Sequence, residues 1–304
     1  MVKIISNYQD LDNLVFCSNN GTIFQTSFWL DYSTSFFVKL GYYENNVLLA
    51  CLIFETQPTK KIGKLGSLAP YLGLVTMRDL SENVKDKVEI DLIRFAKKNF
   101  SNITFFTSPK YNNLTNLLFN GFEAKLSYTN ILCLNKSLKK IFNDFAHNLK
   151  RNIKKAELDG LRVVREFELA NLTKLIKTTF LRQNSSIWFN MLEVEKCISQ
   201  LLKNNYSAIF TTFQENEPIA SVCIVWDNDT AYYILGGYNH HRKHRGAGSI
   251  AMWEAIQFSK SINLLYYDFE GSRLPNINNF FSQFDGNQFA FYQIIDFKDT
   301  ITIY

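Results

Sequence analysis

Residues 238–256, YNHHRKHRGAGSIAMWEAI, bring histidines, cations and glycines together directly before a predicted helix. Glycines lack a Cβ atom, so the backbone N–H groups beside them can approach a ligand closely. The first turn of a helix also offers unpaired N–H donors and a partial positive charge. Arginine and lysine side chains would add charge-assisted hydrogen bonds. The stretch therefore predicts a phosphate-binding turn made of Arg242, Lys243, Arg245, Gly246, Ala247, Gly248 and Ser249.

The same glycines have a second interpretation, because glycine turns also serve only to connect a strand to a helix. A dinucleotide-binding Rossmann turn is excluded, since the G-x-G-x-x-G spacing is absent and the preceding strands form a predicted hairpin.

Two acids stand where catalysis needs a base. Asp268 and Glu270 are two residues apart on a predicted strand, and alternate strand residues share a face. Open α/β sheets place ligands at the carboxyl ends of their strands, so we expect this pair to lie beside the glycine turn. Either carboxylate could act as the base or orient an amine, and either could instead cap the next helix. His240 is a further catalytic candidate as a proton relay, or else a solvated loop residue.

Aromatic and basic side chains are the candidates for substrate contact. Lys150 and Arg151, with Lys154 and Lys155, recur at a spacing of four and form one helix face. Such a face either is solvated or contacts the phosphates of an acceptor or a tRNA. The predicted substrate-binding residues are Tyr71, Trp188, Tyr238, Lys150 and Arg151.

The elements that must position these residues occur twice. FFVKLGYYENNVLLACLIFE (36–55) and SAIFTTFQENEPIASVCIVW (207–226) both read as hairpins, with Glu-Asn pairs 171 residues apart. Phe-x-Gly signals at 119–121 and 284–286 are separated by 165 residues. The similar offsets indicate a duplicated unit.

The order of the predicted elements also matches between the two halves. Helix 81–98, strand 103–108, helix 113–119 and a final strand correspond to helix 247–260, strand 264–270, helix 276–284 and a final strand. This order predicts an α/β fold with mixed sheets and helices on their faces. We expect two tandem domains, 1–136 and 137–304, with Ser137 as the N-cap of the first helix of the second domain.

The composition suits a globular protein without covalent cross-links. No window approaches the apolar run of a membrane span, and the N-terminal stretch lacks the apolar core of a signal peptide. Five scattered cysteines without CxxC spacing predict reduced, buried thiols and no metal site. We therefore expect a cytoplasmic protein. The formal net charge of +5 is compatible with phosphate-bearing ligands.

Several motifs in chain order carry a resemblance to a known family. The spacing Lys243-x-x-Gly246-x-Gly248 is similar to the R/Q-x-x-G-x-G/A loop of GNAT acyltransferases, with Lys in place of Arg or Gln. YYILGGYN (232–239), AMWEAIQFSK (251–260) and YYDFEGSRLPNINNFFSQFDG (266–286) resemble the FemAB-like branch of that superfamily. The segments GTIFQTSFWL (21–30), LAPYLGL (68–74) and NLKRNIKKAELDGLRV (148–163) extend the resemblance over nearly the whole chain.

The resemblance implies two tandem GNAT-like domains and transfer of an acyl or aminoacyl group to an amine. It implies an acceptor among cell-envelope precursors, either amino sugars or peptidoglycan stems, carried by a nucleotide or lipid. We expect acyl-CoA as the co-substrate, bound at the RGAGS turn, with no metal and no DNA partner. Peripheral contact with the inner membrane would follow from a lipid-linked acceptor. The alternatives are a Fem-type aminoacyltransferase that uses aminoacyl-tRNA, and a non-catalytic GNAT pair that only binds the precursor.

Overall fold

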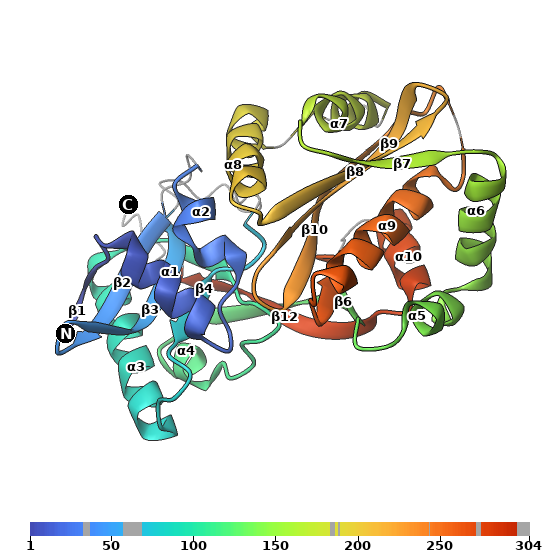
Figure 1. Ribbon diagram of the computed structural model, residues 1–304. Helices are drawn as coiled ribbons and strands as arrows, with labels where there is room; N and C mark the ends of the chain where they lie inside the picture. Colours follow the sequence, from blue (N-terminus) through green and yellow to red (C-terminus); the bar gives the residue numbers. More distant parts are fainter. Residues whose placement is uncertain are drawn as a thin grey trace, which may run out of the picture. The chain divides into compact units, whose positions relative to one another are not determined.

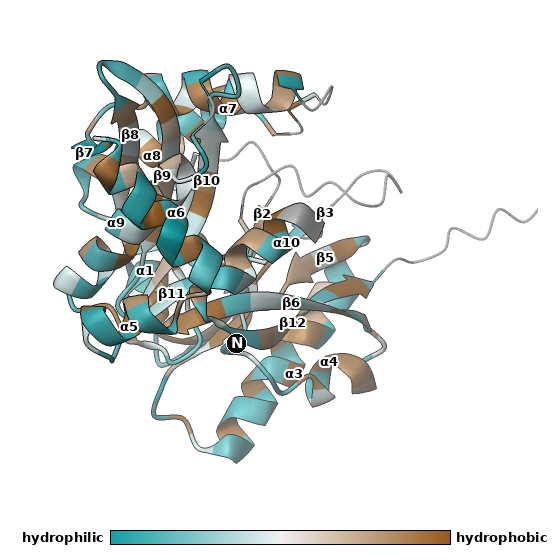
Figure 2. Cartoon of the chain, turned by 90° about the vertical axis from the view of Figure 1, so that its right-hand side faces the viewer, coloured by the Kyte–Doolittle hydropathy of each residue, from teal (hydrophilic) through white to brown (hydrophobic). Residues whose placement is uncertain are grey.

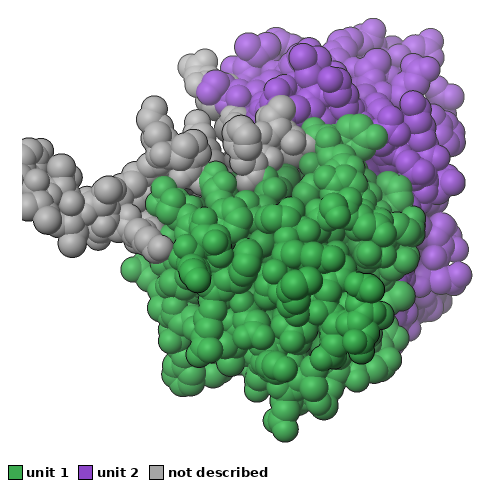
Figure 3. Space-filling view, turned by 90° about the vertical axis from the view of Figure 1, so that its left-hand side faces the viewer, with its two compact units in different colours: residues 1–128, 290–304 green, residues 129–289 purple. Residues whose placement is uncertain are grey.

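The chain folds into mixed α/β architecture in a computed structural model (Figure 1). The structure describes residues 1–32, 37–56, 69–182, 186–187, 189–242, 244–271 and 275–296. It divides into two compact units, Met1–Tyr128 with Ala290–Tyr304, and Thr129–Phe289 (Figure 3). The predicted fold class is confirmed.

Unit 1 is built on an antiparallel sheet in the order β1-β2-β3-β5-β12, with β4 also paired to β3. Ile23–Gln25 forms a 3-10 turn between α1 and α2. Its helices are α1 (Tyr8–Cys17), α2 (Ser27–Leu30), α3 (Glu82–Asn99) and α4 (Thr115–Phe119). Its strands are β1 (Val2–Ile4), β2 (Phe37–Glu44), β3 (Val47–Thr56), β4 (Gly73–Thr76), β5 (Ile103–Phe106) and most of β12 (Asn287–Asp296).

Unit 2 contains the sheet β6-β11-β10-β9-β8-β7, in which only the β10–β11 pair is parallel. In Figure 1, α7 lies on one side of β8–β10 and α9 on the other. The helices are α5 (Leu138–Asp144), α6 (His147–Leu158), α7 (Ala170–Arg182), α8 (Met191–Lys203), α9 (Ala247–Ser261) and α10 (Pro275–Phe281), followed by a 3-10 turn Ser282–Phe284. The strands are the end of β6 (Glu123–Cys133) from Thr129 on, β7 (Arg162–Glu166), β8 (Ser207–Gln214), β9 (Glu217–Trp226), β10 (Thr230–Tyr238) and β11 (Tyr266–Asp268).

The predicted repeat is visible in both hairpins. β2 and β3 turn at Asn45 and Asn46, and β8 and β9 turn at Glu215 and Asn216. Asn45, Asn46 and Glu215 all have positive φ, as tight two-residue hairpin turns require. Ser137 is confirmed as an N-cap, because its hydroxyl accepts the N–H of Lys140 at 3.2 Å.

The final strands of the two repeats are exchanged between the units. β12 comes from the second half of the chain, yet residues 293–296 pair with β5 in unit 1. Residues 131–133 of β6 come from the first half, yet they pair with β11 in unit 2. Compactness therefore divides the chain at 128/129 and 289/290. The predicted boundary at 136/137 separates the repeats along the chain and stays a prediction.

An aromatic core fixes α9 on the sheet of unit 2. Trp253 packs edge-on against Phe145 with ring centroids 5.3 Å apart, and Phe145 in turn meets Phe284 at 5.2 Å. Phe269, directly after β11, joins the same cluster through Phe284. The ends of β11 and α9, which carry the predicted site residues, are thereby anchored in one core.

The cysteines follow the prediction only in part. Cys51, Cys197 and Cys223 are buried, and desolvation raises the pKa of both Cys51 and Cys223 to about 12. Cys17 is exposed and Cys133 half-buried, so the prediction of buried thiols is wrong for Cys17, which lies at the end of α1. Within the described ranges, no helix has the length and apolarity that crossing a membrane requires.

Candidate functional site

The glycine turn before α9 is built differently from the prediction at Gly246. Its backbone N–H donates to Nδ1 of His244 at 3.2 Å, so this amide is already used. A Cβ on Gly246 would lie 2.1 Å from the backbone oxygen of Asn152 and 2.9 Å from Cβ of Ala156, both on α6. Gly246 therefore lets α6 approach the start of α9, and the expected contact between its amide and a phosphate stays a prediction.

His244 ties the turn to neighbouring elements. Its Nε2 lies 2.9 Å from Oδ2 of Asp159, just beyond α6. Hydrogen bonds from Lys155 and from His244 lower the pKa of Asp159. The backbone N–H of His244 donates to the hydroxyl of Tyr238 at 2.8 Å, and that hydroxyl donates to the His244 oxygen at 3.4 Å. Tyr238, predicted to contact substrate, thus shapes the turn itself.

The backbone N–H groups of the two residues after Ala247 are available as donors. The amides of Gly248 and Ser249 make no hydrogen bond with any described residue. A Cβ on Gly248 would meet no atom within 4 Å, so the space around it is free. Ala247 is fully buried, and its carbonyl accepts the hydroxyl of Thr212 at 2.9 Å. Two of the predicted anion-binding residues therefore offer free N–H groups at a helix start.

The cations predicted around the turn are only partly available. Arg245 is exposed and forms no ion pair with a described residue. Arg242 lies 3.6 Å from Glu215, a pair exposed enough to be screened by solvent. Lys243 is outside the described residues.

The basic face of α6 flanks this turn. Lys150 donates to the backbone oxygen of Asn143 at 2.7 Å, which satisfies the carboxyl end of α5. Arg151 and Lys154 are exposed and have no ion pair within the described ranges. Hydrophilic residues dominate the ribbon of α6 (Figure 2).

Asp268 acts as a structural acid at the end of β11. It is 1% exposed, and its Oδ1 accepts the hydroxyl of Thr129 at 2.5 Å. The same oxygen accepts the backbone N–H of Glu270 at 2.7 Å. Asp268 therefore fixes the segment that carries Glu270.

Glu270 combines strain, burial and an unpaired oxygen. Its φ of 58° lies in the left-handed region, which few residues other than glycine adopt. The residue is half-buried, but Oε1 is buried and makes no hydrogen bond to any described residue. Desolvation, assisted by the charge of Asp268, raises the pKa of Glu270 well above its ordinary value. Backbone strain and a raised carboxyl pKa are typical of catalytic bases.

Tyr233 of β10 shares this environment and was not predicted. Burial, and then the charge of Glu270, raise the pKa of its hydroxyl. A Cβ on Gly236 would lie 2.2 Å from that hydroxyl, so the first glycine of the Gly-Gly pair makes room for it. The register between β10 and β9 shifts between Tyr233 and Leu235, which marks a β-bulge. Tyr233 was missed because a tyrosine in an apolar strand has no distinct sequence signal.

Comparison with known proteins supports one interpretation of this geometry. Residues 143–276, which include the turn, α9 and Glu270, match the family described as "Acetyltransferase (GNAT) domain". The structure titled "Crystal structure of FemX" matches with a TM-score of 0.74 at 12% identity, covering 96% of each chain. Residues 143–276 therefore form a GNAT-type acetyltransferase domain, and the chain as a whole has the fold of the FemX structure.

Two other solved structures resemble this chain over nearly its full length. The C-terminal domain of a putative lysylphosphatidylglycerol synthetase from Agrobacterium fabrum has a TM-score of 0.58 at 9% identity, covering 95% of this chain and 91% of that one. A tandem GNAT protein from the clavulanic acid pathway has a TM-score of 0.53 at 6% identity, covering 97% and 98%. These likenesses concern the fold. A search of curated proteins finds no significant match.

The two acids and the turn are linked through β10. Asp268 at the end of β11 pairs with Tyr232, and β10 continues from there to Tyr238, after which the glycine turn begins. The expectation that both acids lie beside the glycine turn stays a prediction.

Three other residues were predicted to contact substrate or to take part in catalysis. Tyr71 is fully buried in unit 1, where its ring packs edge-on against Phe24 and Phe291, so it is a core residue and the predicted substrate contact is wrong. Trp188 is outside the described residues. The ring of His240 stacks on His241 with centroids 3.9 Å apart, and its catalytic role stays a prediction. Within the described ranges, no group of three or more His, Cys, Asp or Glu could hold a metal ion.

Proposed function

We propose that this acyltransferase transfers an acyl group from acyl-CoA to an amine of a cell-envelope precursor. The free amides of Gly248 and Ser249, at the start of α9 and next to the exposed Arg245, support the donor. They offer N–H groups and positive charge to a diphosphate.

Glu270 supplies the base in this proposal. An amine attacks an acyl carbon only as the neutral species, so its proton must be removed. The new C–N bond forms as the C–S bond of the thioester breaks, the amine proton passes to the Glu270 carboxylate, and the thiolate leaves with CoA. A raised pKa makes Glu270 a stronger base once it is ionised. Asp268 positions it through the Glu270 N–H.

The acceptor is proposed from the FemAB-like fold. One protein with this fold is titled a putative lysylphosphatidylglycerol synthetase. We propose an amino sugar or a peptidoglycan stem as the acceptor, linked to a nucleotide or lipid, in the cytoplasm or at the inner membrane surface. Lys150 and Arg151 on α6 are the proposed contacts for its phosphates.

Aminoacyl-tRNA is the second candidate donor. The exposed Arg151 and Lys154 on α6 favour it, because a row of cations without ion pairs suits a phosphate backbone. In that case the bond that breaks is the ester to the tRNA.

Thermal unfolding with acetyl-CoA tests the donor. A ligand at 100 times its Kd stabilises the folded state by about 2.7 kcal/mol. We therefore expect acetyl-CoA at this concentration to raise the Tm of the protein. Arg245→Gln should weaken acetyl-CoA binding about tenfold, the loss of one charge-assisted contact. Lys196→Gln, an exposed charge on α8, is the matched control and should bind as the wild type does.

Two results would contradict parts of this proposal. The first, an unchanged Tm at saturating acetyl-CoA, would reject acyl-CoA as the donor. The second, equal weakening in Arg245→Gln and Lys196→Gln, would reject Arg245 as a contact of the diphosphate. Retention of charged tRNA that falls steeply with salt, together with the first result, would support the tRNA donor instead.

A further inference from the structure

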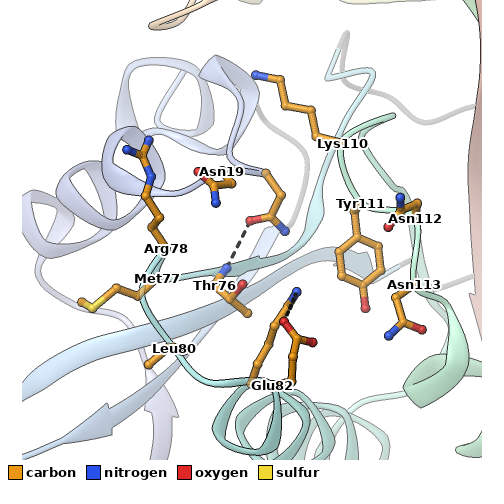
Figure 4. Close-up of a pocket in the computed structure, with 12 residues that line it drawn as sticks. Asn19, Thr76, Met77, Arg78, Leu80, Glu82, Lys110, Tyr111, Asn112 and Asn113 are labelled. Atoms are coloured by element: carbon orange, nitrogen blue, oxygen red, sulfur yellow. Dashed lines mark hydrogen bonds and ion pairs between the residues drawn. The ribbon is translucent and has the colours of Figure 1, made fainter.

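A cavity of about 160 Å³ lies in unit 1, outside the proposed donor site (Figure 4). Three separate segments line it: residues 19–20 after α1, the turn between β4 and α3, and residues 110–113 after β5. Lys85, one turn into α3, completes the lining. The cavity belongs entirely to the first repeat.

Its place in that repeat corresponds to the glycine turn of the second. In unit 2 the turn joins β10 to α9, and in unit 1 the matching turn joins β4 to α3. The unit 1 turn contains no glycine, so no site was predicted here from the sequence. Side chains, not bare backbone, form this cavity.

The charge of the lining is positive. Arg78 and Lys110 extend from different segments at the cavity (Figure 4). Lys85 is the third cation, and its Nζ lies 4.0 Å from Glu82, the one acid of the lining. Arg78 forms no ion pair with a described residue. A guanidinium of this kind binds phosphate oxygens in a bidentate manner.

Carboxamides supply the remaining polar groups. Asn19, Asn112 and Asn113 are exposed at the cavity and carry both donors and acceptors, as hydroxyl groups require. Three cations with three carboxamides match a ligand that bears both phosphate and hydroxyl groups.

The floor of the cavity is held rigidly. Asn20 donates to the backbone oxygen of Leu74 at 2.9 Å and accepts the Thr76 N–H at 3.3 Å. The hydroxyl of Tyr111 donates to the buried Glu89 at 3.2 Å, which fixes the ring as one wall. A site fixed before binding loses little conformational entropy when a ligand enters.

From this arrangement we infer that the unit 1 cavity binds a small phosphorylated polyol, such as a sugar phosphate, with Arg78 and Lys110 on the phosphate. The site is distinct from the donor turn and adds a ligand to the donor and the acceptor proposed above.

Calorimetric titration of the full chain tests this site. Glucose 6-phosphate should bind, inorganic phosphate should bind more weakly, and glucose should give no heat. Arg78→Gln and Lys110→Gln should each raise the Kd for glucose 6-phosphate about tenfold, as expected for one charge-assisted contact. Arg94→Gln is the matched control, since Arg94 is exposed on α3 and does not line the cavity.

Three results would contradict the inference. No heat from glucose 6-phosphate with the wild type would overturn it. Equal weakening in Arg94→Gln and Arg78→Gln would show only an effect of net charge. Binding that is lost in Arg245→Gln but kept in Arg78→Gln would assign the phosphate to the α9 turn instead. Tm values without ligand verify that each variant is folded.

Discussion

At the scale of single residues, the two acids at the end of β11 have separate tasks. Oδ1 of Asp268 accepts hydrogen bonds from Thr129 and from the backbone of Glu270, whereas Oε1 of Glu270 is buried without a hydrogen bond to any described residue. The residue in the strained conformation is thus the one left available for proton transfer. Its neighbour holds that conformation in place.

Replacing Glu270 by Gln should lower kcat about 10²–10⁴-fold, the usual contribution of a general base. Binding of the donor diphosphate should not change, because its proposed contacts are the amides of Gly248 and Ser249 and not Glu270. Steady-state kinetics measure both. Glu217→Gln, at the exposed start of β9, is the matched control. A kcat in Glu270→Gln equal to that of the control would remove Glu270 as the base.

The raised pKa of Glu270 also predicts how stability depends on pH. Below the ordinary glutamate pKa, both the folded and unfolded states carry the proton, and the stabilisation is complete. As pH rises through the raised folded pKa, the unfolding free energy falls, by up to about 1.4 kcal/mol per pH unit. Glu270→Gln should lack this decline, and urea unfolding at several pH values measures the difference. Identical pH profiles would contradict the burial of this acid.

At the scale of elements, the contact between α6 and α9 depends on Gly246. Gly246→Ala places a Cβ 2.1 Å from the α6 backbone, so we expect a loss of about 1–3 kcal/mol of unfolding free energy, as overpacking costs. Gly248→Ala is the control: its Cβ meets only space, and alanine favours the helix by up to about 1 kcal/mol. Urea unfolding compares the two. Equal unfolding free energies for the two variants would show that α6 can shift to accommodate the added Cβ without loss of stability.

The same turn shows how far sequence reasoning reaches. The helix expected over 247–260 is observed over Ala247–Ser261, and the one expected over 81–98 is observed over Glu82–Asn99. Periodicity and caps act within a few residues, so they were sufficient for the elements. The task of Gly246 depends on Asn152, more than ninety residues earlier in the chain, and no local pattern records that contact.

The site residues divide in the same manner. The free amides of Gly248 and Ser249 and the candidate base Glu270 lie in segments that the sequence analysis selected. Tyr71 was assigned to substrate because it lies in a family-like motif, but its ring serves an aromatic core. The cavity of unit 1 was missed because its cations come from separate segments without a glycine turn.

At the scale of the whole molecule, unit 1 depends on a strand from the far end of the chain. Ile294 and Ile295 of β12 are buried there, Lys97 pairs with Asp296 at 3.2 Å, and Thr107 donates its N–H to the Tyr292 oxygen at 2.8 Å. Each buried isoleucine contributes about 1.5–3 kcal/mol. Alternation of apolar residues predicts a strand but not its partner, so the exchange could not be predicted from the sequence.

Ending the chain after residue 289 should therefore expose β5 and β3 to hydrogen exchange, while β8 and β9 keep their protection. Ending it after residue 296 leaves β12 complete and serves as the control. Hydrogen exchange with mass spectrometry reads both regions. Protection of β5 that survives in the shorter chain would show that β12 is dispensable for unit 1.

The exchange of β12 also imposes an order on biosynthesis. Domains generally fold as they leave the ribosome, with the N-terminal one first. Here the N-terminal unit cannot close its sheet until residues 290–296 have been translated. Until then β5 presents an unpaired edge, which is a site for wrong association between nascent chains. Slow or interrupted translation should therefore lower the yield of folded protein, because the N-terminal unit stays incomplete for longer and can associate wrongly.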